Sequence, residues 1–149
     1  MTAVETTITN TLPSIAGVRE RLAGIVAAHG VPRAVAAHMN IALDEALSNI
    51  IKHGYPDGGV HEIRLRLAVS EGMLIAEIED DGVPFDPLNA PAPDIDAPLE
   101  QRPVGGLGVH FMRELMDEVA YTRTAGHNSL VLKKRLDNEK GDRNGTASA

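Results

Sequence analysis

The stretch ALDEALSNIIKHGY, residues 42–55, decides how this chain is interpreted. At about 100° per residue, its apolar positions continue one face of a helix that is expected to start near Pro32 and to run to about His53. We expect that face to pack on a core; it comprises Ala36, Met39, Leu43, Ala46, Leu47 and Ile50. The roughly opposite face comprises His38, Ala42, Glu45, Asn49 and Lys52.

Two residues of the polar face, Glu45 and Asn49, are four positions apart, so their side chains are neighbours on a helix. Charged groups opposite an apolar stripe are normal for a solvated surface, and this explanation accounts for most of the face. Asn49 fits it less well, because asparagine is a mediocre helix former inside a helix. The stretch alone therefore leaves two interpretations open, a solvated outer face or the wall of a functional site.

The bulk composition indicates a single globular domain. The chain has 149 residues, of which 43% are hydrophobic and 23% are charged, which is enough length and apolar content for a real core. The net charge of -7 and the lack of a basic stripe argue against nucleic-acid binding. The absence of cysteine excludes disulfides and thiolate metal sites. No signal pattern and no membrane-length apolar segment is present, so we expect a cytoplasmic protein.

The remaining segments predict strands and helices in a defined order. β-branched or alternating residues predict strands over 5–12, 62–69, 73–80, 119–124 and 128–136. A helix is expected between a cap at Ser14 and Gly30, and another after the glycines near residue 105. This order predicts an α+β fold, a two-layer sandwich with helices on one face of a mixed, mostly antiparallel sheet. The domain is expected over residues 1–136, followed by a frayed tail over 137–149.

The segment 83–104 has no usable periodicity and holds six of the nine prolines. A loop of this length is uncommon in a compact domain and is usually a lid or a binding loop. It is preceded by EIEDDGVPFDP, in which alternation from Leu74, Ala76 and Ile78 places Asp80, rather than Asp81, on the inward side. A buried aspartate needs a partner or a ligand. Asp-Gly is also a common turn dipeptide, so a plain turn is the alternative.

The segment VGGLGVHFMREL follows the loop and places three glycines directly before a predicted helix. Backbone N–H groups and the positive helix end make such a turn suitable for an anion or phosphate. The spacing matches neither a P-loop nor a dinucleotide-binding turn. A flexible hinge for the preceding loop is the alternative explanation.

Taken together, these motifs resemble the GHKL ATPase superfamily, which has the Bergerat ATP-binding fold. NIIKH is similar to its asparagine box, DDGVPFDP and GGLG to its glycine boxes, and GHNSLVLKKRL to its closing strand. The resemblance covers about residues 6–136. Within the superfamily, LDEALSNIIKHGY, DDGVPFDP and GGLGVHFM are most similar to stand-alone anti-sigma-factor serine/threonine kinases of bacterial partner-switching systems.

The resemblance implies ATP and Mg²⁺ as ligands and a role for several residues. Asn49 would coordinate Mg²⁺, Glu45 would be the general base, and Lys52 and His53 would help to neutralise phosphate charge. Asp80 would accept the exocyclic amine of adenine.

The remaining implied roles concern the base pocket and the phosphates. Gly82 would give the base room, and residues 83–104 would form the ATP lid. Asn128 lies where the superfamily often has a threonine near the adenine. Backbone N–H groups would be donated to the phosphates from the second glycine box, which contains Gly105, Gly106, Leu107, Gly108 and Val109.

The resemblance also implies protein partners, namely a small anti-sigma-factor antagonist as substrate and a sigma factor or similar regulator. A non-catalytic module that uses ATP as a structural ligand is the second hypothesis, and a histidine phosphotransfer domain is the third. Against the third, His29 is expected to be structural, His38 solvated and His110 at the surface. No upstream phosphoacceptor helix pair and no transducer domain is expected. The sequence leaves oligomeric state, including a homodimer, open.

Overall fold

The computed structural model describes residues 2–86 and 112–137. Five strands form one sheet in the order β1-β2-β3-β5-β4, and all four pairings are antiparallel. The mostly antiparallel sheet that the sequence predicts is therefore antiparallel throughout the described residues. The strands are β1 (Thr2–Thr9), β2 (Glu62–Ser70), β3 (Met73–Asp80), β4 (Glu118–Thr124) and β5 (His127–Arg135).

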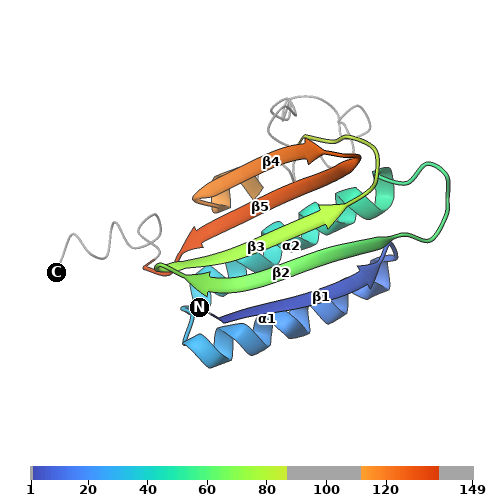
Figure 1. Ribbon diagram of the computed structural model, residues 1–149. Helices are drawn as coiled ribbons and strands as arrows, with labels where there is room; N and C mark the ends of the chain where they lie inside the picture. The colour runs from blue at the N-terminus through green and yellow to red at the C-terminus, as the bar shows by residue number, and fades with distance from the viewer. Residues whose placement is uncertain (1, 87–111, 138–149) are drawn as a thin grey trace, which may run out of the picture.

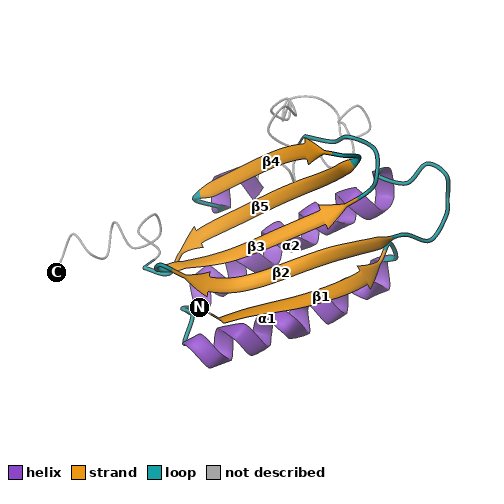
Figure 2. Cartoon of the chain, viewed as in Figure 1, coloured by secondary structure: helices purple, strands orange, loops and turns teal. Residues whose placement is uncertain are grey.

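Two long helices, α1 (Ile15–His29) and α2 (Arg33–His53), lie behind the sheet in Figure 1, and a short helix η1 (Leu12–Ser14) precedes α1. Figure 2 shows the same arrangement as one orange layer of strands and one purple layer of helices. A single cluster of buried apolar residues joins the two layers. The predicted two-layer α+β sandwich is thus confirmed.

The boundaries of the elements follow local sequence chemistry. Gly30 closes α1 in the left-handed conformation at φ 61°, a backbone region that favours glycine. The first strand ends at Thr9 and not near residue 12 as predicted, because the next residues turn into η1. The turns Glu71–Gly72 and Ala125–Gly126 have positive φ at both positions, which suits the twist of a two-residue hairpin. These turns join the hairpins β2–β3 and β4–β5.

Helix α2 buries a wider stripe than the sequence predicts. Ala42 was expected on the polar face but is 0% exposed. Because α2 contacts α1 as well as β3 and β5, more of its circumference is covered than a contact with the sheet alone would require. His38, expected to be solvated, is half-buried, and its Nδ1 is buried without a hydrogen-bond partner among the described residues. Burial lowers the pKa of His38, with a further contribution from nearby Lys134.

One inward position of β5 carries a charge. Lys134 continues the buried row of Asn128, Leu130 and Leu132 and is only 1% exposed. Its Nζ donates a hydrogen bond of 2.8 Å to the carbonyl oxygen of Leu115, at the end of the helical residues 112–115. A cation at this position satisfies a terminal helix carbonyl and interacts favourably with the negative end of the helix dipole.

Candidate functional site

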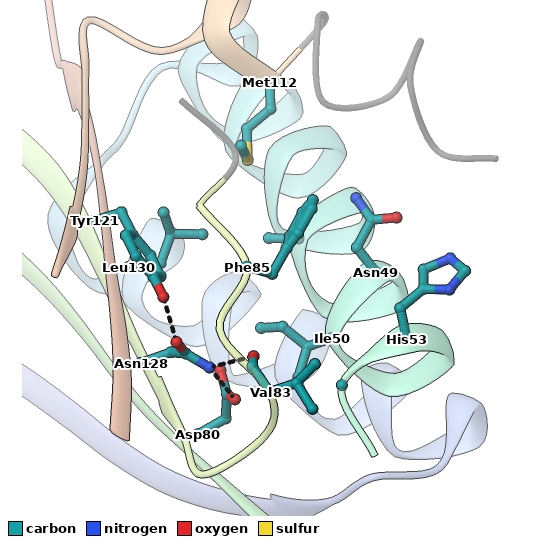
Figure 3. A pocket seen from close by; sticks show the side chains of 12 residues that line it. Asn49, Ile50, His53, Asp80, Val83, Phe85, Met112, Tyr121, Asn128 and Leu130 are labelled. Atoms are coloured by element: carbon teal, nitrogen blue, oxygen red, sulfur yellow. Dashed lines mark hydrogen bonds between the residues drawn. The ribbon is translucent and has the colours of Figure 1, made fainter. Parts of the chain in front are cut away.

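A pocket lies between the C-terminal part of α2 and the ends of the strands β3, β4 and β5 (Figure 3). Its volume is about 40 Å³, which is room for a few water molecules and too small for a purine base. The exposed side chains of Val83 and Phe85 belong to the lining, so their movement would be needed to admit a larger ligand. The lining comprises Ala46, Asn49, Ile50, His53, Gly54, Asp80, Val83, Phe85, Met112, Tyr121, Asn128 and Leu130.

Asp80 is the buried acid of this pocket. It ends β3 on the inward side and is only 5% exposed, whereas the side chain of Asp81 is 47% exposed. The alternation in the sequence therefore predicted the inward aspartate correctly. One carboxylate oxygen, Oδ1, accepts hydrogen bonds from the backbone N–H of Gly82 at 2.8 Å and from Nδ2 of Asn128 at 2.9 Å. These bonds fix the direction of the carboxylate.

Asn128 faces Asp80 because the two residues are register partners at the end of the β3–β5 pairing. Its Nδ2 also donates to the carbonyl oxygen of Val83 at 3.0 Å, and its Oδ1 accepts from Nη1 of Arg123 at 3.0 Å and from the hydroxyl of Tyr121. Tyr121 and Arg123 were not identified from the sequence. They lie on β4, and only the β4–β5 register brings them to Asn128, so no local motif marks them.

A close backbone contact holds the first glycine motif against the end of α2. The N–H of Val83 donates to the carbonyl oxygen of Gly54 at 2.9 Å. A Cβ atom on Gly82 would lie 2.7 Å from that same oxygen, so no larger residue fits without a shift. Among the described residues, it is therefore the backbone of Gly54 that approaches Gly82. The room for a base that the resemblance implies at Gly82 stays a prediction.

The polar residues predicted on α2 are arranged differently from the acid on β3. Asn49 and His53 line the pocket, whereas Glu45 and Lys52 do not belong to the described lining. Glu45 and Asn49 are half-buried, and Lys52 and His53 are exposed. None of these four side chains makes a hydrogen bond or ion pair to another residue within the described ranges. The amide oxygen of Asn49 is therefore free, and a neutral oxygen of this kind is a suitable ligand for Mg²⁺.

A cluster around His61, the rim cluster, lines a second hollow beside Gly82. His61 stacks on the ring of Tyr55, with ring centroids 4.4 Å apart. Its Nε2 lies 2.9 Å from Asp57 and its Nδ1 lies 3.3 Å from Asp81. The hydrogen bond with Asp57 is the main cause that raises the pKa of His61. Burial, followed by nearby aspartates, raises the pKa of Tyr55.

Several predicted features lie outside the described residues. They include the second glycine box, Gly105, Gly106, Leu107, Gly108 and Val109, together with most of the predicted lid and all but the first residue of the predicted tail. Within residues 2–86 and 112–137, no helix has the length and apolar content that crossing a membrane requires.

Comparison with known proteins adds several similarities. The chain is 33% identical over 94 residues to the serine/threonine-protein kinase BtrW of Bordetella bronchiseptica, covering 63% of this chain and 66% of that protein. It is 32% identical over 123 residues to the serine-protein kinase RsbW of Bacillus cereus, covering 80% of this chain and 76% of that protein. The chain therefore spans about two thirds to three quarters of these relatives.

Solved structures show the same fold. A structure of the RsbU and RsbW domains of Rv1364c from Mycobacterium tuberculosis matches 91% of this chain and 32% of that chain, with a TM-score of 0.65 and 20% identity. A histidine kinase domain from Erythrobacter litoralis matches 87% of this chain and 63% of that chain, with a TM-score of 0.54 and 20% identity. The family described as histidine kinase-like ATPase domain matches residues 8–134. This match confirms the GHKL resemblance, and this chain belongs to the histidine kinase-like ATPase family.

Proposed function

We propose that this protein binds ATP with Mg²⁺ and transfers the terminal phosphoryl group to a serine or threonine of a partner protein. The observation that carries the proposal is the position of Asp80, a buried acceptor at the base of a pocket whose opposite wall presents Asn49. Membership of the family supports ATP as the ligand. The similarity to proteins named serine-protein kinases supports phosphoryl transfer as the reaction.

In this proposal each side chain has a defined task. Asp80 accepts the adenine amine, and Asn49 offers its amide oxygen to Mg²⁺, which neutralises charge on the phosphates when bound. Glu45, one helical turn from Asn49, accepts the proton of the attacking hydroxyl. Lys52 is exposed and adds positive charge toward the phosphates, and the exposed side chain of His53, which lines the pocket, also faces them.

The phosphates would also be held by backbone N–H groups of residues 105–109, at the start of a helix. The partner would be a small anti-sigma-factor antagonist, and a sigma factor or similar regulator would be sequestered when that antagonist is phosphorylated. The net charge of -7 favours a basic protein partner over nucleic acid. We place this activity in the cytoplasm, and a homodimer is compatible with it.

One observation favours a second candidate, a regulatory module that binds ATP without transferring phosphate. Glu45 does not belong to the described lining of the pocket, whereas Asn49 does. In such a module, ATP would change only the affinity for the partner, and Glu45 would be dispensable.

The two candidates are separated by Glu45→Gln, assayed with labelled ATP and a bound antagonist protein. If Glu45 is the general base, transfer should fall by about 10²- to 10⁴-fold while ATP affinity stays unchanged. Glu20→Gln, at an exposed position of α1, is the matched control and should transfer normally. Absence of transfer by the wild-type protein to a bound antagonist, with ATP-dependent binding retained, would favour the non-catalytic module.

A further inference from the structure

The side chain of Asn128 is fully engaged within the protein, although the family resemblance suggested a place beside the nucleotide. It is 5% exposed, and both ends of its amide have partners. The oxygen accepts from Arg123 and Tyr121, and the nitrogen donates to Asp80 and Val83, with a longer contact of 3.4 Å to the carbonyl oxygen of Gly82. No donor or acceptor of this amide is left over for a ligand in this arrangement.

The orientation of this amide is determined by the chemistry of its neighbours. A guanidinium can only donate, so the atom that faces Nη1 of Arg123 must be the oxygen. The carboxylate of Asp80 and the carbonyl of Val83 accept, so the atom that faces them must be the nitrogen. A flipped amide would place donors against a donor and an acceptor against acceptors. Figure 3 shows the chain of contacts from Tyr121 through Asn128 to Asp80 and Val83.

These contacts leave one side of the Asp80 carboxylate for a ligand. Oδ1 is occupied by the N–H of Gly82 and the amide of Asn128. Oδ2 has no hydrogen bond to any residue in the described ranges. A carboxylate oxygen held in this way has the chemistry to accept a hydrogen bond from the exocyclic amine of adenine. The carbonyl oxygen that guanine carries at the corresponding position accepts and does not donate, so it would be repelled.

We propose that Asn128 is a positioning residue, oriented by Tyr121 and Arg123, that sets the selectivity of the pocket for adenine over guanine by holding the carboxylate of Asp80. This inference rests on the proposed ATP-binding function and adds the residues that determine base specificity. Aspartate at position 128 would have the same shape but would place a carboxylate against Asp80 and two carbonyl oxygens. Alanine would free Asp80 to rotate.

The test measures the dissociation constants of ATP and GTP with the full chain and Asn128→Asp, Asn128→Ala and Tyr121→Phe. At alkaline pH, Asn128→Asp should weaken ATP binding by about tenfold to a hundredfold, the range for loss of a hydrogen bond to a charged group. Binding should recover as the pH falls, because a protonated Asp at this position can donate to Asp80 again. Asn128→Ala should reduce the ATP-to-GTP preference, and Tyr121→Phe should reduce it less.

Ser129→Ala is the matched control, because Ser129 is the next residue of β5 and its side chain faces away from the pocket. A role in folding alone would lower the unfolding temperature and weaken ATP and GTP binding equally, with no recovery at low pH, and this result would overturn the inference. Tyr121→Phe decides the matter if both Asn128 variants fail to fold, since an unchanged ATP-to-GTP ratio in that variant would also overturn it. A wild-type protein that binds neither nucleotide would overturn the proposed function and this inference together.

Discussion

The two walls of the pocket are built in opposite ways. On the strand side, Asp80 and Asn128 are buried, and their polar atoms are joined by a continuous set of hydrogen bonds to β4 and to the loop after β3. On the helix side, Asn49 is half-buried and His53 is exposed, and neither side chain makes a hydrogen bond to another described residue. The pocket therefore has one wall fixed by the protein and one wall with free polar groups.

In the proposed function, this difference assigns a different part of the nucleotide to each wall. Buried polar groups must be satisfied within the fold, and polar groups held in this way keep their direction when a ligand binds. That property suits the base, which has a fixed pattern of donors and acceptors. Polar groups near solvent need no internal partner, so Asn49 and its neighbours remain available for a metal ion and phosphates.

The largest effect is expected for Asn49→Ala. A residue that only orients a metal ligand is worth about 10- to 100-fold in metal affinity, so loss of a ligand should weaken binding of ATP with Mg²⁺ by about 100-fold or more. Adenosine, which has no phosphates, should bind the variant and the wild type equally, as calorimetry can measure.

Asn40→Ala, in the same helix but outside the pocket lining, is the control and should bind both ligands normally. An equal loss of adenosine and ATP affinity in Asn49→Ala would show that the two walls do not act separately.

A smaller effect is expected where the two walls touch, at Gly82→Ala. The added Cβ would lie 2.7 Å from the carbonyl oxygen of Gly54, so the backbone must shift. Overpacking of this kind costs about 1–3 kcal/mol in the free energy of unfolding, which urea denaturation can measure.

Gly24→Ala is a matched control, because Gly24 lies on the exposed face of α1 and a Cβ atom added there would have no neighbouring atom within 4 Å. It should stabilise the protein by about 0.5–1 kcal/mol, as alanine does in a helix interior. Equal effects at both positions would argue against the close contact between Gly54 and Gly82.

The smallest effect is expected at the rim cluster around His61, as a pH dependence of stability. The pKa of His61 is raised in the fold, chiefly by the hydrogen bond with Asp57. Its contribution should be fully present below the unfolded pKa and lost as the pH rises through the folded pKa, so the loss begins above about 6.5. His61→Gln should remove this component from urea midpoints measured across neutral pH.

The same substitution at exposed His29, which makes no ion pair within the described residues, should leave the component in place. A pH dependence that persists unchanged in His61→Gln would mean that the rim cluster does not contribute through the charge of this histidine.

The sequence predicted features that depend on local periodicity and missed those that depend on distant pairing. Alternation along β3 was enough to place Asp80 inward, and Gly30 was enough to end α1. Ala42 was assigned to the wrong face because the contact of α2 with α1 cannot be read from α2 alone. Tyr121 and Arg123 reach Asn128 only through the β4–β5 register, which no local motif encodes. The roles of the α2 polar residues remain predictions.

The pairing of β3 with β5 has a consequence for folding. Asp80 and Asn128 are the last partners of this pairing, and they come from two hairpins separated by the long segment after residue 80. A slip of β5 by one residue would turn Asn128 and Lys134 to the opposite face of the sheet and leave Asp80 without its partner. Tight nucleotide binding would therefore report that the two hairpins have joined in the correct alignment, and the ligand would selectively stabilise chains that have done so.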